Sequence, residues 1–325
     1  MTLFSHQARV HHFITRSELV ADRRFRGRPA KKAWEHEVEE GSVIGSPTRR
    51  SVDRVASLKD LFSLIPGTSL NLERLFHPVE VEAAAATWRI LSAVDAATRI
   101  DPADVRAVLH LRHLNFVRNP NNIERTLNQA RTARDLRFTD RVAADAMNSL
   151  DEVADDQLRF RADRFDVSVD QYRDWLRTLA VLCVPFPDGR IPLVEIVNEF
   201  MFDGPHATLL RLLVAPDGDE RSTFVVPDRG MLFEAVKSQQ DSAFQIATLS
   251  ARVMIIGVTE PNAKEFRLAA QYGPQAVDFI RAGLSEVSVE SVDQASVRHY
   301  NKLLIGYARA HVYSEYRSPV GTEGP

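Results

Sequence analysis

The amino-terminal end of the sequence carries the strongest candidates for chemistry, because His11, His12 and Arg16 lie within six residues. An imidazole titrates near neutral pH and can act as a general acid or base. A guanidinium offers a planar fork of donors to a phosphate or a carboxylate. These residue types suit phosphodiester chemistry, although composition alone favours a plain basic arm or a strand with His12 facing outward.

A second candidate is Asp228, which follows the apolar run Phe224–Val226 and Pro227. A carboxylate at a strand end is a common catalytic or metal-binding placement, because the strand positions it, and it is also a common turn residue. A nuclease of the Pro-Asp type needs another acid and a lysine on the next strand. Glu234 and Lys237 have a different spacing and fall on a predicted helix, so this match is poor.

Other polar residues give weaker signals. Arg118 ends a predicted helix, where the macrodipole favours a cation, and Asn301 lies on a long predicted helix. Together with His11 they are candidate binding residues. His110 and His113 place two imidazoles on one helical face, but no nearby carboxylate completes a ligand set. We predict no metal ligands, and the cofactor is left open, a divalent metal ion included.

Several common catalytic motifs are absent from the sequence. It has no P-loop, no G-x-G-x-x-G, no G-x-S-x-G and no H-E-x-x-H. The single cysteine, Cys183, excludes an intramolecular disulfide and a cysteine-rich zinc site. Most motif-readable NTPases, dinucleotide enzymes, serine hydrolases and zincins are therefore excluded, whereas enzymes whose sites assemble from distant residues are not.

The elements that must position these residues begin with a predicted hairpin and a helical middle. Alternating residues predict a strand over 33–39, turn residues follow from Gly41 to Pro47, and a second extended piece covers 52–56. Helical patterns begin near Val79, and Asp101-Pro102 is typical of an N-cap followed by a first-turn proline. That helix is expected to end at Asn119-Pro120. Further helices are expected over 121–136, 139–150, 152–165 and 169–182.

In the last third of the chain, short apolar runs alternate with turn residues, a pattern typical of a β-sheet. The runs 208–214 and 222–226 flank a Pro-Asp-Gly turn and predict a hairpin, and two more strands are expected over 244–249 and 252–258. The remaining expected elements are helices over 261–271, 274–283 and 290–309 and a strand over 311–313. The fold class is therefore α+β: a largely helical middle, a smaller, mainly antiparallel sheet in the C-terminal third and a short N-terminal hairpin.

Composition and charge limit the classes of binding partner that we expect. The chain has 325 residues, is 26% charged and carries a formal charge of −3, which argues against a generally basic nucleic-acid binder. It has 35 arginines against six lysines, and nine of the arginines fall in the first 60 residues. No apolar run approaches the ~20 residues of a membrane span and no signal peptide is evident. We expect a cytoplasmic protein without membrane contact, with nucleic acid as a candidate partner and an undetermined oligomeric state.

Several blocks of the sequence resemble a bacterial family catalogued as domain of unknown function 4238. His12, Arg16 and Leu19 are similar to its opening His-Tyr-Val-Pro-Arg motif, although Thr15 stands where the family has proline. Asp228 matches the acid of a Ser-Asp-Asn-Pro strand end in the family. The other positions that resemble family motifs are Arg118, Pro120, Asn301, Ala308, Val312, Tyr313 and Ser314.

The order of these blocks implies one integrated domain over 1–317. It would comprise an arginine- and histidine-rich segment 1–60, a helical part 61–200 and a sheet-containing part 201–317, with 318–325 as a flexible tail. The family has no assigned function. Its association with accessory and defence-type bacterial proteins favours a nucleic-acid-directed role by analogy alone.

Two functional hypotheses follow, and whether the protein is an enzyme stays open. In the first, the protein is a nuclease-like hydrolase of phosphodiesters: His12 is the general acid or base, Arg16 holds phosphate, and Asp228 orients an imidazole or binds a metal. In the second, it is a non-catalytic module that binds nucleic acid or protein through its arginine-rich N-terminal region. A scaffold whose arginine content reflects only Arg-for-Lys usage is a third interpretation.

Overall fold

The structure of the protein is a computed structural model that describes residues 10–12, 32–51, 57–59, 73–130, 141–203, 206–235, 243–261 and 287–323. It combines helices with two larger, mostly antiparallel sheets, so the α+β class is confirmed. The extended piece expected over 52–56 and nearly all of the helices expected over 261–271 and 274–283 lie outside the described residues.

The helical part occupies the middle of the chain, as expected. The helix α3 (Pro102–Arg118) begins where the sequence predicts. The Asp101 side chain accepts a hydrogen bond from the Ala103 N–H, and Pro102 lies in the first turn. The described elements are α2 (Glu73–Asp95), α3 (Pro102–Arg118), the 3-10 turn η2 (Pro120–Asn122), α4 (Ile123–Gln129), α5 (Arg141–Asp151), α6 (Asp155–Arg164), α7 (Val169–Cys183), α8 (Pro192–Asn198) and the π-helical turn η4 (Glu199–Asp203).

The larger sheet has the strand order β10-β5-β9-β8-β7. The two strands predicted over 244–249 and 252–258 are confirmed as β8 (Ala243–Ser250) and β9 (Val253–Pro261), and they pair with each other as a hairpin. The hairpin predicted between 208–214 and 222–226 is wrong: β5 (His206–Val214) pairs antiparallel with β9 over its whole length and parallel with β10 (Ser288–Ser291). The strand β9 also has nine residues, so it pairs with β5 along its full length, whereas the predicted partner over 222–226 has only five. Glu234, expected on a helix, lies in β7 (Leu232–Ala235).

The second sheet has the order β3-β2-β11-β6 and joins the two ends of the described chain. The predicted N-terminal hairpin is confirmed as β2 (Lys32–Glu39) and β3 (Ser42–Ser51). Its return strand starts earlier than predicted, because Glu40 and Gly41 both have positive φ and complete the turn in two residues. The other strands are β11 (His311–Ser314) and β6 (Val226–Pro227). A separate pair is made by β1 (Val10–His12) and β4 (Ser57–Lys59).

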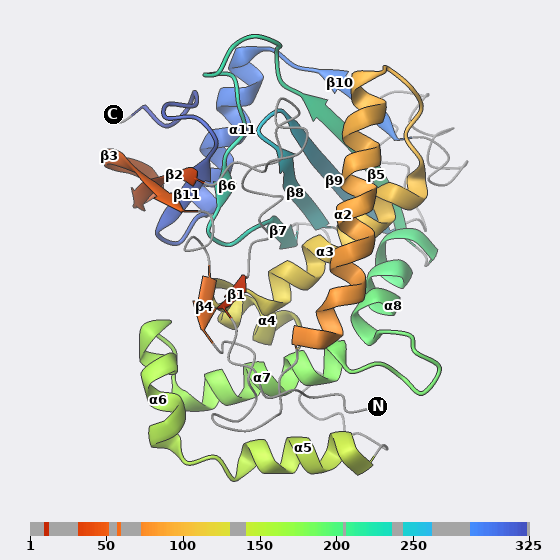
Figure 1. The fold of residues 1–325 in the computed structure, drawn as a ribbon, viewed down its shortest axis with the longest axis vertical. Coiled ribbons are helices and arrows are strands. Elements are labelled where there is room, and N and C mark those ends of the chain that lie inside the picture. The colour runs from red at the N-terminus through yellow and green to blue at the C-terminus, as the bar shows by residue number, and fades with distance from the viewer. Residues whose placement is uncertain are drawn as a thin grey trace.

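The helix α3 lies at the centre of the molecule. Figure 1 shows α2 alongside it, the larger sheet above, and α5 and α7 at the lower end. Most of the α3 residues are buried all around the helix, and one apolar cluster contains side chains of α2, α3, α7 and the larger sheet. A second cluster joins α11 (Gln294–Tyr307) to the smaller sheet and to one part of the larger sheet. The helix α11 is shorter than predicted because β10 occupies its expected beginning.

The end of the described chain is packed rather than loose. We expected 318–325 to be a flexible tail, but Val320 is 0% exposed and belongs to the cluster around α11. Its N–H donates to the Arg221 carbonyl oxygen, and its own carbonyl oxygen accepts from the Asn301 side chain. Gly321 has a φ of +90° and lies against α11, where a Cβ would approach the Asn301 Cβ to 3.1 Å. This close approach explains why glycine follows the buried valine.

Candidate functional site

Asp228 is a buried carboxylate at the end of β6, only 3% exposed. Its Oδ1 accepts from the Arg309 N–H at 2.8 Å, and its Oδ2 accepts from the N–H groups of Ala310 and His311 at 2.8 and 3.1 Å. The Asp228 N–H donates in turn to the His311 carbonyl oxygen at 2.9 Å. The carboxylate therefore fastens the end of β6 to the segment that leads into β11, and both oxygens are occupied by backbone donors.

The turn after α3 holds the main chain around Asp228 from the other side. The Nδ2 groups of Asn119 and Asn121 donate to the Asp228 carbonyl oxygen at 2.8 and 3.3 Å. The Asn122 Nδ2 donates to the Arg229 carbonyl oxygen at 3.0 Å. Two segments that the sequence analysis treated separately, the helix end after Arg118 and the strand end at Asp228, are thus brought into direct contact.

Arg118 and Asn301 lie in the interior, each with 0% exposure. The Arg118 Nη2 is 2.7 Å from the Glu80 Oε1, and its guanidinium lies over the Phe76 ring at 5.2 Å. The Asn301 Oδ1 accepts from the Val225 N–H, and its Nδ2 donates to the carbonyl oxygens of Thr223 and Val320. These contacts give both residues a structural role: Arg118 joins α2 to α3, and Asn301 joins α11 to the strand before Asp228.

The remaining predicted site residues lie at the amino-terminal end. The backbone of His11 and His12 belongs to β1, in which they pair with Leu58 and Ser57. Their side chains and the whole of Arg16 lie outside the described residues. The joint catalytic group of His12, Arg16 and Asp228 therefore stays a prediction.

His110 and His113 each face an amide. The His113 Nε2 is 3.2 Å from the Gln245 Oε1, and the His110 Nε2 is 2.8 Å from the Asn198 Oδ1. Burial lowers the pKa of His113 to about 4 and also lowers the pKa of His110, so burial favours the neutral form of both rings. Over the described ranges, no group of three or more His, Cys, Asp or Glu could hold a metal ion.

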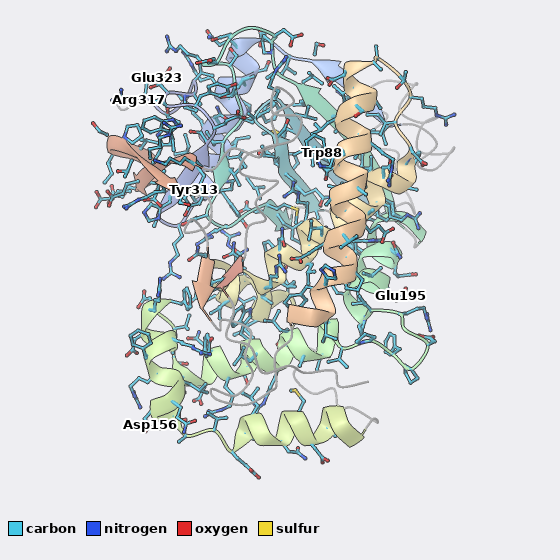
Figure 2. The ribbon with its side chains drawn as sticks, in the orientation of Figure 1. Trp88, Asp156, Glu195, Tyr313, Arg317 and Glu323 are labelled. Atoms are coloured by element: carbon cyan, nitrogen blue, oxygen red, sulfur yellow. The ribbon has the colours of Figure 1, made fainter. Side chains whose placement is uncertain are left out.

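An exposed basic surface lies at one end of the smaller sheet. Trp34 of β2 lies directly opposite Arg49 of β3, whose guanidinium is 5.8 Å from the centre of the indole ring. Arg317, which follows β11, places its guanidinium 5.7 Å from the same ring. Lys32 lies two residues before Trp34 and shares its face of the strand. We call these four residues the basic platform; Figure 2 shows Arg317 beside the hairpin, at the edge of the molecule.

The pleat of β2 separates the charges. Lys32, Trp34 and His36 alternate to one face, whereas Glu35, Glu37 and Glu39 alternate to the other. Glu35 forms an ion pair with Arg50 of β3 at 3.1 Å. Lys32, Arg49 and Arg317, by contrast, form no ion pair with any residue inside the described ranges. The basic platform is therefore an exposed group of three cations around one aromatic ring.

A short chain of hydrogen bonds positions Arg317. The Ser314 hydroxyl donates to the Tyr316 carbonyl oxygen at 2.6 Å, so its own oxygen is left to accept from the His36 Nε2, 2.9 Å away. Burial lowers the pKa of His36 to about 4, and the ring is therefore a neutral donor at pH 7. The interaction fixes the backbone immediately before Arg317 to β2.

Sequence reasoning missed Trp34, Lys32 and Arg317 as site residues. One local signal was available: along residues 32–39, Lys32, Trp34 and His36 alternate with the acids Glu35, Glu37 and Glu39. Arg49 was included only in the count of N-terminal arginines. No local signal links Arg317 to Trp34, because the two residues come from opposite ends of the described chain.

Comparison with known proteins adds no relative. No family model matches the chain, and no match was found among curated proteins or solved structures. The resemblance to the family of unknown function therefore stays a prediction. In the part of the chain that the structure describes, no helix is both long enough and apolar enough to cross a membrane.

Proposed function

We propose that the protein binds single-stranded nucleic acid and that the strand docks on the basic platform. The observation that carries the proposal is the pair of guanidinia over the Trp34 ring, from Arg49 and Arg317. Proteins that bind single strands combine aromatic stacking surfaces with cations that follow the phosphates. Arginine serves both purposes, because its flat guanidinium stacks on bases and its donors fit a phosphate.

The exposure of the cations supports this assignment. Lys32, Arg49 and Arg317 are exposed, and both guanidinium-to-ring distances are close to the ~6 Å limit of a cation–π contact. The arginine side chains can therefore move onto phosphates at little cost and leave the indole to a base. Bases in a duplex are already stacked on one another, so the basic platform should prefer unpaired strands.

We expect Trp34→Ala to weaken the binding of an unstructured single-stranded oligonucleotide by about 5- to 150-fold, the loss that corresponds to one base–aromatic stack of 1–3 kcal/mol. Fluorescence anisotropy with a labelled oligonucleotide measures the effect. The matched control is Trp88→Ala, because Trp88 is 50% exposed on α2 and lies outside the basic platform. Equal affinities of wild type and Trp34→Ala, or equal binding of single strand and duplex, would contradict the proposal.

Hydrolysis of the bound strand is the second candidate function. Three observations bear on a catalytic role of Asp228. It ends a strand, and it lies beside two arginines, Arg229 in sequence and Arg309 in space. Both of its carboxylate oxygens, however, already accept backbone hydrogen bonds. The first two favour catalysis and the third opposes it. Incubation of the oligonucleotide with Mg²⁺ or Mn²⁺, in parallel with His12→Ala, tests the hypothesis. Cleavage that His12→Ala abolishes supports an enzyme, and an intact oligonucleotide supports a binding module.

A further inference from the structure

A second group of arginines lies near Tyr307, the last residue of α11. The guanidinium of Arg125, from α4, lies 4.6 Å from the centre of the phenol ring, and that of Arg229 lies 5.4 Å from it. Arg309 follows two residues after Tyr307, and its charge also acts on Arg229. Tyr307 itself is buried. We call Arg125, Arg229 and Arg309 the arginine cluster.

The acids near the arginine cluster leave its centre unpaired. Glu234 is 3.2 Å from Arg125 and Asp166 is 3.8 Å from Arg309, and both acids are largely exposed. Asp228, the remaining acid, is committed to three backbone N–H groups. Arg229 forms no ion pair with another described residue, and its buried Nε has no hydrogen-bond acceptor there. Exposed ion pairs are weak, so an incoming anion can displace both outer acids.

The position of Arg229 is energetically unfavourable without an anion. Burial, followed by the like charge of Arg125, lowers the pKa of Arg229, which means that its surroundings disfavour the charged form. A half-buried guanidinium beside two like charges costs stability. A bound oxyanion would attract the three arginines and so offset their mutual repulsion. It would also supply the hydrogen-bond acceptor that the Arg229 Nε lacks.

The backbone that carries Arg229 is held in place before any ligand arrives. The Asn122 Nδ2 holds the Arg229 carbonyl oxygen, and Gly230, at a φ of +81°, turns the chain immediately afterwards. The hydrogen bonds of Asp228 fix the backbone of Arg309 to the same turn. The backbone is therefore fixed before a ligand binds at two of the three arginines, at Arg229 by Asn122 and at Arg309 by the Asp228 carboxylate, which reduces the entropy lost on binding.

We propose that the arginine cluster is a phosphate-binding site, separate from the basic platform. The two sites lie at opposite ends of β11, since Arg309 precedes that strand and Arg317 follows it. The guanidinia of Arg125 and Arg229 lie over the same ring, and the charge of Arg309 acts on Arg229, so the arginine cluster offers several donors to a phosphate group with two or three free oxygens. Such a group occurs in inorganic phosphate, in a nucleotide and at the 5′ end of a nucleic-acid strand. Only the last of these sources rests on the proposed function.

Calorimetric titration with pyrophosphate tests the site directly. We expect Arg229→Gln to weaken pyrophosphate binding by about 10- to 100-fold, the loss of one or two charge-assisted hydrogen bonds. The control is Arg190→Gln, because Arg190 is an exposed arginine paired with Asp188 and Glu195, acids of its own loop and of α8. Without ligand, Arg229→Gln should be at least as stable as wild type, since it removes like-charge repulsion. Equal pyrophosphate affinity in wild type and Arg229→Gln, or no binding by wild type, overturns the proposal.

A second comparison identifies the source of the phosphate. If it is the 5′ end of a strand, a 5′-phosphorylated oligonucleotide should bind more tightly than the unphosphorylated one, and Arg229→Gln should remove the difference. If the two oligonucleotides bind equally while Arg229→Gln still weakens pyrophosphate binding, the site takes a free phosphate compound. Trp34→Ala should leave pyrophosphate binding unchanged, so failure at the basic platform is distinguishable from failure at the arginine cluster.

Discussion

Replacing Asp228 with alanine is expected to lower the free energy of unfolding by about 3–5 kcal/mol. The substitution removes a buried carboxylate that accepts hydrogen bonds from three consecutive N–H groups, those of Arg309, Ala310 and His311. Each of these donors is then left without its acceptor in the interior, and an unsatisfied buried donor is costly. Urea denaturation followed by circular dichroism measures the change.

Two further variants separate this structural role from a catalytic one. Asp228→Asn keeps the shape of the side chain but loses the charge and replaces one acceptor oxygen with an NH2 group that faces a backbone N–H, and we expect a loss of about 1–3 kcal/mol. Asp163→Ala, at an exposed acid of α6, should stay within about 0.5 kcal/mol of wild type. A stable Asp228→Ala protein would contradict the structural role, and one that had also lost cleavage activity would restore the catalytic hypothesis.

Acid is expected to destabilise the protein well above the pH at which its carboxylates titrate. Burial lowers the pKa values of His36 and His113 to about 4, whereas both rings titrate near 6.5 in the unfolded chain. Between these values the unfolded state binds more protons, so stability falls as pH decreases below 6.5 and continues to fall until about pH 4. Each histidine should contribute a loss of about 2 kcal/mol between pH 7 and pH 5.

The measurement is the free energy of unfolding in urea at pH 7 and pH 5. His113→Gln retains a partner for Gln245 without a titrating ring and should reduce the pH-dependent loss by about 2 kcal/mol. His299→Gln, at an exposed position of α11, serves as the control and should behave as wild type does. Equal losses in wild type and His113→Gln would show that this buried histidine does not carry the effect.

The parts of the fold that could be predicted from the sequence are those set by local signals. Asp101-Pro102 marks the start of α3, the β8–β9 hairpin is closed by a two-residue turn, and the short strand β11 follows the end of α11. Strand pairing is determined by distant residues. The Pro-Asp-Gly turn after β5 resembles a hairpin turn, but β9 offers β5 nine paired residues, whereas β6 has two residues and one of them is Pro227.

The same distinction applies to the candidate sites. The sequence marks Asp228 as a notable acid, but its three partners are backbone groups about eighty residues further on, and backbone donors carry no sequence signal. The alternation in β2 is a local signal for a face that carries Lys32 and Trp34, which the sequence analysis did not use, and no local signal indicates that Arg317 lies beside Trp34. The arginine content near the N-terminus therefore points to the region of the basic platform, although one of its two arginines, Arg317, comes from the other end of the chain.

The salt dependence of oligonucleotide binding tests the central claim, that the basic platform holds a nucleic-acid strand, most directly. The logarithm of affinity falls with the logarithm of salt concentration with a slope of about −0.7 per phosphate contact for single strands. Replacing Lys32, Arg49 and Arg317 together with glutamine should reduce that slope by about 2. The same change of charge at the exposed residues Arg159, Arg164 and Arg190 should leave it unaltered. If both triple variants keep the wild-type slope, the strand does not contact the basic platform.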